Sequence, residues 1–232
     1  MKGEKFYFTT NLNANVNVMN ERKLDPIDKI LKRAGSTLQS LPSSRKYNGR
    51  ENPARKIPET ELSENERLHS AGLMRVNHAG EIAAQGLYQG HSIFVRNPDT
   101  EKQILQAAQE ELDHLNWCKQ RLEELDAKPS ILSPIWYSGA FLMGALSSLF
   151  GDKWSLGFIE ETEKQVSSHL MNHLQKISEN DSKSRAIIKK MREEEEEHGN
   201  NAKNAGARNL PIAIRKLMQL TSKVMTKTAY WI

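Results

Sequence analysis

The chain contains the pattern Glu-x-x-His twice in helix-forming surroundings, as Glu111-Leu-Asp-His114 and as Glu195-Glu-Glu-His198. Residues three apart project from the same face of an α-helix, so each pattern places a carboxylate beside an imidazole. A further glutamate precedes each pattern, Glu81 by 30 positions and Glu163 by 32. One Glu helix followed by one Glu-x-x-His helix, stated twice, is the ligand set of a four-helix di-iron site. The sequence therefore predicts an all-α bundle with the metal ligands Glu81, Glu111, His114, Glu163, Glu195 and His198.

A third match, Glu66-Arg-Leu-His69, does not belong to this set. His69 precedes Glu81 by 12 residues, which on one helix is a rise of ~18 Å. The two retained patterns lie 84 positions apart, and their preceding glutamates lie 82 apart. Such a constant offset is what a duplicated helical hairpin predicts.

The remaining acidic and histidine residues are assigned by register. Glu160 and Glu161 compete with Glu163, which is preferred because its distance to Glu195 comes nearest to the spacing in the first hairpin. Within the run 193–197, only Glu195 has the register with His198, so the other glutamates are expected to face water. His169, six positions beyond Glu163, is expected to contact a ligand carboxylate from outside the metal centre. No catalytic residue is predicted beyond the metal ligands.

Composition narrows the class further. The chain has 232 residues, a formal net charge of +4 and only 6% aromatic residues, which suits one helical domain with appendages. The single cysteine, Cys118, excludes an internal disulfide and is expected to be a small buried residue. The mild basic charge suits an anionic lipid surface; without a Lys/Arg stripe interleaved with aromatic residues, nucleic acid is not expected. The first 20 residues lack the apolar stretch of a cleavable signal peptide.

Three regions follow from patterning. Residues 1–22 are rich in asparagine and predict a disordered extension, with Met19 as an alternative start. Residues 23–60 predict a short helix after Asp25-Pro26 and then a linker. Residues 61–232 predict the di-iron domain. Its long helices are expected at about 63–95, opened by a Ser63–Glu66 capping box, and then at about 98–126, 153–178 and 182–205.

Two apolar segments accompany the four helices. Residues 131–150 carry no charge, which fits either a buried crossover helix or an apolar lid at a lipid interface. A membrane span is disfavoured there because both hairpins must meet on one side of a bilayer. After Gly206 and Pro211, a last helix is expected to have an apolar face and lysines elsewhere. That face suits a membrane surface or packing on the bundle.

The ligand set predicts oxygen chemistry. Four carboxylates and two imidazoles suit two irons and leave open positions where dioxygen binds. By the arrangement of such bundles, Glu111 and Glu195 are expected to bridge both irons, with Glu81 and His114 completing one and Glu163 and His198 the other. Such a centre can reduce dioxygen and insert one oxygen atom into an electron-rich ring.

Four stretches resemble the demethoxyubiquinone hydroxylases of ubiquinone biosynthesis, in their bacterial branch. They are Ala71 through Glu81, Ala107 through His114, Pro129 through Gly144, and Trp154-Ser-Leu-Gly-Phe158 with Glu161-Thr-Glu163. The resemblance covers about residues 24–232 and all six ligands. It implies a ferritin-like bundle and a monooxygenase that hydroxylates the ring of 2-polyprenyl-3-methyl-6-methoxy-1,4-benzoquinone. Members of the eukaryotic branch have Tyr where this chain has Leu170, so no role for that tyrosine carries over.

The resemblance also implies a setting for the enzyme. We expect peripheral attachment to the cytoplasmic side of the cell membrane, with other ubiquinone-biosynthesis proteins or an oligomer as candidate partners. NADH is the implied electron source, yet Gly80, Gly86 and Gly90 fall within a helix and form no phosphate-binding loop. The alternatives are another ferritin-like di-iron protein, such as a peroxidase or tRNA hydroxylase, and a non-catalytic helical adaptor on membranes.

Overall fold

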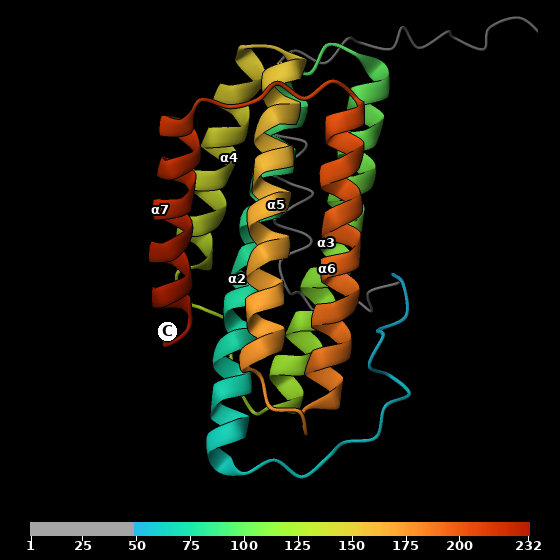
Figure 1. Cartoon of the computed structure of the whole chain (residues 1–232), viewed down its shortest axis with the longest axis vertical. Helices are drawn as coiled ribbons and strands as arrows, with labels where there is room; N and C mark the ends of the chain where they lie inside the picture. The colour runs from blue at the N-terminus through green and yellow to red at the C-terminus, as the bar shows by residue number, and fades with distance from the viewer. Residues whose placement is uncertain (1–48) are drawn as a thin grey trace, which may run out of the picture.

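The computed structural model describes residues 49–232, which form an all-helical bundle without strands (Figure 1). The helices are α2 (Glu64–Phe94), α3 (Pro98–Glu124), α4 (Ser133–Leu149), α5 (Asp152–Lys176), α6 (Ser182–Asn204) and α7 (Ile212–Ala229). The predicted fold class is therefore confirmed over this part of the chain. The predicted extension 1–22 and the short helix after Asp25-Pro26 lie outside the described residues, and the domain boundary at 61 stays a prediction.

The helix ends follow the capping residues of the sequence. The Ser63 hydroxyl accepts a hydrogen bond from the Glu66 amide, and the Glu66 carboxylate accepts one from the Ser63 amide at 2.9 Å, so the predicted capping box is present. The side chains of Asn97 and Asp181 cap α3 and α6 in the same way. Gly206 follows α6 with a φ of 96°, which favours glycine. These caps fix where the ligand-bearing helices begin and end.

Two helical hairpins build the core of the bundle. Helix α2 packs on α3, and α5 packs on α6, while α3 also contacts α6 and α2 contacts α5. The connection between the hairpins is α4, which packs chiefly along α2. The arrangement expected from the sequence is thus present: two helical hairpins, α2 with α3 and α5 with α6, lie together in one bundle (Figure 1).

Of the two alternatives for residues 131–150, the structure contradicts the buried helix, although the segment does connect the two hairpins as a crossover. In α4 only Ala140, Gly144, Ser147 and Ser148 are buried, whereas the large apolar side chains, such as Leu142 and Leu146, face outward. The cause lies in the small residues, because they let α4 approach α2 closely along one narrow stripe. A Cβ added to Gly144 would lie 2.2 Å from the Leu87 carbonyl oxygen. Only small residues fit that stripe, so the bulky ones are left on the other side.

Helix α7 also exposes apolar side chains on its surface. Leu217, Leu220 and Val224 are each at least half exposed, so the predicted apolar face does not pack on the bundle. The end of α7 is anchored, because Ala229 and Tyr230 share a small apolar cluster with Trp136 of α4. Within residues 49–232, no helix has both the length and the hydropathy needed to cross a bilayer.

The residues before α2 form a strap, residues 49–62, which lies along α3 and α6. Ala54 of this strap is buried in the main apolar cluster. Asn52 donates a hydrogen bond to Gln120 at 2.8 Å, and Glu59 accepts from the buried Arg121 at 2.9 and 3.0 Å. In Figure 1 the strap passes outside α6 and below the bundle before it enters α2. The linker expected there has no helix, yet it is fixed to the bundle.

Two glycines of α4 test the close contact with α2. Gly144→Ala should lower the free energy of unfolding by about 1–3 kcal/mol, because the new methyl group meets the α2 backbone. Gly139 is the matched control: a Cβ there meets nothing within 4 Å, so Gly139→Ala should raise stability by up to about 1 kcal/mol. Urea unfolding measures both. Equal effects of the two substitutions would contradict the proposed packing.

Candidate metal centre

The structure brings all six predicted ligands into one buried cluster. Their side chains come from α2 (Glu81), α3 (Glu111 and His114), α5 (Glu163) and α6 (Glu195 and His198), and all are buried. Ligand atoms of Glu81, Glu111, His114 and Glu195 lie within 4.8 Å of one another. His198 contacts both Glu111 and Glu195, and Glu163 is close enough to Glu195 for the charge of that carboxylate to raise its pKa, so the other two residues join the same cluster.

Glu111 and Glu195 stand between the two imidazoles. The Nδ1 atom of His114 lies 3.2 Å from Glu111 Oε2 and 3.2 Å from Glu195 Oε1. The Nδ1 atom of His198 lies 3.1 Å from Glu111 Oε1 and 3.4 Å from Glu195 Oε2. Each of these carboxylates therefore offers one oxygen to each histidine. That arrangement suits two cations bridged by both carboxylates.

The two remaining carboxylates lie at opposite ends of this arrangement. Glu81 Oε2 is 3.8 Å from His114 Nδ1. Glu163 accepts a hydrogen bond from the buried Tyr88 hydroxyl at 2.7 Å, which fixes the orientation of one of its oxygens. Each end of the cluster thus has one histidine and one terminal glutamate, as the duplicated sequence pattern predicts.

Electrostatics show how strained this cluster is without a cation. Burial raises the pKa of Glu81 and of Glu163 well above the ordinary value, and neighbouring carboxylates add to the effect. Burial alone lowers the pKa of both histidines, but the surrounding carboxylates outweigh it. They raise the pKa of His198 to about 12 and that of His114 well above its usual value. The cluster therefore disfavours further negative charge, and a cation among these groups would offset that charge.

The donor set fits divalent metal ions. Several buried atoms in the cluster lack a hydrogen bond of acceptable geometry, namely Glu81 Oε2, Glu111 Oε1, both oxygens of Glu195 and His198 Nδ1. Buried polar atoms without partners are costly unless something else satisfies them. Because these atoms converge on one point, a cation is the partner that would satisfy them together. Carboxylate oxygens and imidazole nitrogens are suitable ligands for iron.

An outer pair of carboxylates was not predicted. Glu194 Oε2 lies 2.7 Å from His114 Nε2, and Glu110 Oε2 lies 2.7 Å from His198 Nε2. The expectation that Glu194 faces water is wrong, because its side chain is only 10% exposed and binds the histidine of the other hairpin. A signal was present in the sequence, since Glu110-Glu111 and Glu194-Glu195 repeat at the same offset of 84 positions. Such outer contacts fix the ring of a metal-binding histidine.

Other singled-out residues lie elsewhere. The ring of His169 lies tilted against that of His173 at a centroid distance of 3.9 Å, and its contact with a ligand carboxylate stays a prediction. Cys118 is fully buried, as expected for a small packing residue. His91 is buried, and its Nδ1 lies within hydrogen-bond distance of the hydroxyls of Ser147 and Ser155.

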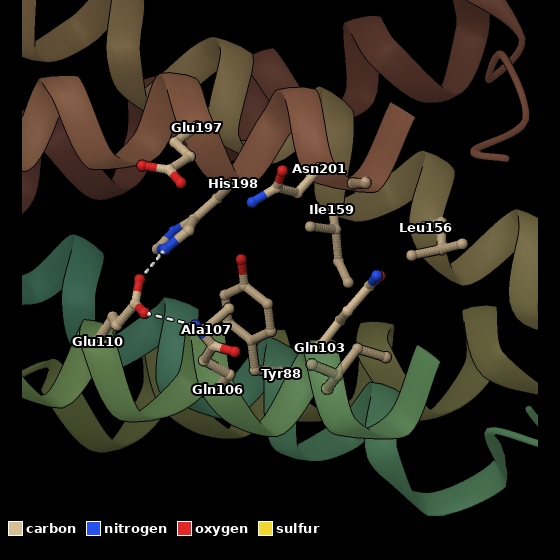
Figure 2. A pocket seen from close by; sticks show the side chains of 12 residues that line it. Tyr88, Gln103, Gln106, Ala107, Glu110, Leu156, Ile159, Glu197, His198 and Asn201 are labelled. Atoms are coloured by element: carbon tan, nitrogen blue, oxygen red, sulfur yellow. Dashed lines mark hydrogen bonds and ion pairs between the residues drawn. The ribbon is translucent and has the colours of Figure 1, made fainter. Parts of the chain in front are cut away.

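A cavity of about 280 Å³ reaches the cluster at His198 (Figure 2). Its lining is mixed: Ala107 of α3 and Ile159 of α5 contribute apolar surface beside Tyr88, and polar side chains of α3 and α6 contribute the rest. Polar side chains, including Glu110 and Asn201, lie at its rim. Figure 2 shows Glu110 between His198 and Gln106, with an interaction to each. The cavity therefore connects one end of the cluster with the surface.

The fold and the site together define a ferritin-like helical bundle with a buried carboxylate–histidine centre that can hold metal ions. Within that class, the chain belongs to the family described as ubiquinone biosynthesis protein COQ7, whose model matches residues 68–229. The family predicted from the sequence is thereby confirmed.

Curated relatives cover nearly the whole chain. A protein of Legionella pneumophila (strain Corby) is 48% identical over 207 residues, which is 89% of this chain and 97% of the relative. A protein of Nitrosococcus oceani is 48% identical over 92% of this chain and 100% of its own length. A Ralstonia pickettii protein is 54% identical over 74% of this chain and 79% of its own. All three are named 3-demethoxyubiquinol 3-hydroxylase.

The assignment of Glu195 as a ligand is tested by iron content. Glu195→Ala should reduce bound iron from two to less than about one per chain, because this carboxylate faces both histidines. Glu193→Ala is the control, since Glu193 is an exposed residue of the same acidic run. Iron is measured after reconstitution, with circular dichroism to verify helicity. Two irons retained in Glu195→Ala would refute the assignment.

Proposed function

We propose that this chain hydroxylates the ring of 2-polyprenyl-3-methyl-6-methoxy-1,4-benzoquinone, or of its quinol, in ubiquinone biosynthesis. The observation that carries the proposal is the convergence of four carboxylates and two histidines in one buried cluster in a member of this family. The names of the relatives, which refer to the quinol, support the choice of substrate. The enzyme uses dioxygen and an external reductant.

We assign the residues that would hold two irons. Glu111 and Glu195 would contact both, Glu81 and His114 would complete one position, and Glu163 and His198 would complete the other. When bound, such a pair of irons supplies the binding and two-electron reduction of dioxygen.

The protein's own groups position and shield this chemistry. Glu194 and Glu110 hold the rings of His114 and His198 through Nε2, so that Nδ1 of each ring faces the cluster. Tyr88 orients Glu163. All six side chains are buried, which limits contact of the centre with bulk water to the cavity at His198.

The overall reaction balances with an external donor of two electrons. A ring C–H bond is replaced by C–OH with one atom of dioxygen, and the other atom leaves as water after taking up two electrons and two protons. NADH is the candidate donor. Electrons would then reach the centre either directly from the donor or from a partner protein that carries them.

The exposed apolar faces of α4 and α7 suit a substrate with a polyprenyl tail. Leu142 and Leu146 on α4 and Leu217 and Leu220 on α7 are each about 60% exposed. Lys216, Lys223 and Lys227 are exposed on α7, and lysines beside an apolar face attract anionic lipids. We therefore place the enzyme peripherally on the cytoplasmic side of the cell membrane.

Quinone analysis tests the reaction. Cells that lack this protein should accumulate a demethoxy quinone and lose most of their ubiquinone. The wild-type gene and the Glu193→Ala variant should both restore ubiquinone. The Glu195→Ala variant should not. Liquid chromatography with mass spectrometry measures both quinones. Normal ubiquinone content in the deleted cells would refute the function.

Vesicle binding tests the membrane face. A Leu142→Glu/Leu217→Glu protein should bind vesicles of anionic phospholipid at least tenfold more weakly, since each buried leucine contributes about 1.5–3 kcal/mol. Leu105→Glu is the control, because Leu105 is 48% exposed but lies on α3. Co-sedimentation measures binding. Equal binding of both proteins would contradict the assigned face.

A further inference from the structure

The two ends of the cluster are alike in ligands but differ in their surroundings. Each histidine is held at Nε2 by a glutamate from the opposite hairpin, at 2.7 Å in both cases. The side chain of Glu194 is 10% exposed, whereas that of Glu110 is 29% exposed. His114 is fully buried, and His198 lines the cavity. Solvent therefore has access to one end only.

Arg50 of the strap closes the His114 end. Its guanidinium donates to both oxygens of Glu194 at 2.6 and 3.0 Å, while its Nε donates to Asp113. The Arg50 amide also donates to Asp113 at 3.1 Å. Because Asp113 is on α3 and Glu194 is on α6, one side chain joins the two helices over the metal centre.

An aromatic side chain further restrains this arginine. The guanidinium lies over the Trp117 ring at 5.1 Å, and the Trp117 indole N–H donates to the Arg50 carbonyl oxygen at 3.4 Å. Trp117 in turn lies against His114, with ring centroids 5.3 Å apart. Arg50, Trp117 and Glu194 thus enclose the His114 ring from outside.

The His198 end has no comparable closure among the described residues. Glu110 hydrogen-bonds to His198 and interacts with the neutral side chain of Gln106, and it stands at the wall of the cavity (Figure 2). Asn201 lies at the same mouth and is exposed. Small molecules and hydrated ions can therefore approach His198 without any helix moving.

We propose that Arg50 is a positioning residue that locks the His114 end of the metal centre, so that metal enters and leaves at the His198 end through the cavity. The inference rests on the proposed metal centre and adds that its two positions are unequal. Release of a metal ion needs water or a competing ligand to replace the protein ligands in turn. At the His114 end, Glu194 and Arg50 hold the ring in place and occupy the approach. Loss of outer contacts of this type weakens metal binding by about 10–100-fold.

Iron release from the reconstituted full chain tests the inference. Protein with two ferrous ions is mixed without oxygen with excess bipyridine, and the coloured complex is followed in time. The wild type should release one equivalent in a fast phase and one in a slow phase. Arg50→Ala should accelerate the slow phase at least tenfold and leave the fast phase within twofold. Arg50→Lys should accelerate the slow phase by a smaller factor, because a lysine ammonium keeps the charge but lacks the planar fork that bridges both carboxylates.

Matched variants separate the strap from the cavity. Arg55→Ala, which removes an exposed arginine paired with Glu51 in the same strap, should leave both phases unchanged. Asn201→Trp should slow only the fast phase by narrowing the mouth. Lys203→Trp is its control, since Lys203 is exposed on α6 and does not line the cavity.

The outcomes distinguish this inference from the proposed function. A wild type that binds two irons and releases both in one phase would overturn the inference alone. A folded Arg50→Ala or Arg50→Lys protein with an unchanged slow phase would also overturn it, as would a fast phase unchanged by Asn201→Trp. A wild type that binds no iron would instead overturn the proposed metal centre.

Discussion

Mutual repulsion of buried carboxylates is the constraint on which this structure depends. Glu81, Glu111, Glu163 and Glu195 share one interior space, and four negative charges there without compensation would destabilise the fold. The two imidazoles that contact them favour positive charge, because the surrounding carboxylates raise the pKa of both rings. The bundle must therefore keep six polar side chains in register, whether protons or cations occupy the centre.

The rest of the fold maintains that register from outside. Arg121, buried at the end of α3, binds Asp181 at the start of α6 and Glu59 of the strap. Arg50 joins the same two helices nearer to the metal centre. On the opposite side, glycines draw α4 onto α2, and large apolar side chains remain exposed there. Helices that carry ligands are thus joined by charge on one side, whereas α4 and α7 add apolar surface on the other.

Most of the fold and the clustering of the six predicted ligands could be predicted because both depend on local periodicity. The spacing within Glu111–His114 and Glu195–His198 fixes one helix face, and the caps at Ser63 and Gly206 are short-range signals. Relations across helices were harder to predict. Whether Glu194 faces water or His114 depends on how α6 is rotated against α3, which its own helix does not determine.

The outward face of α4 was left open by the sequence, and the contacts of Arg50 were missed, because both depend on packing between segments. An uncharged segment suits a protein interior and a lipid surface equally well, and only the approach of Gly144 to the α2 backbone decides which side chains face outward. Arg50 lies in a stretch whose composition indicates a linker, so neither period nor motif relates it to Asp113 or Glu194. Both the outward face of α4 and the partners of Arg50 are determined by contacts between segments far apart in sequence.

The crossed pairing of the outer glutamates has a consequence for how such a protein could arise. Each hairpin contributes a histidine whose orientation is set by the other hairpin, Glu194 for His114 and Glu110 for His198. A single hairpin would therefore hold an incomplete half-site, and only two copies in reciprocal contact would complete it. An ancestral hairpin of this design would have worked as a symmetric dimer before duplication joined its copies into one chain. Two half-sites within one chain can differ in their outer contacts, as the unequal exposure of Glu194 and Glu110 shows here.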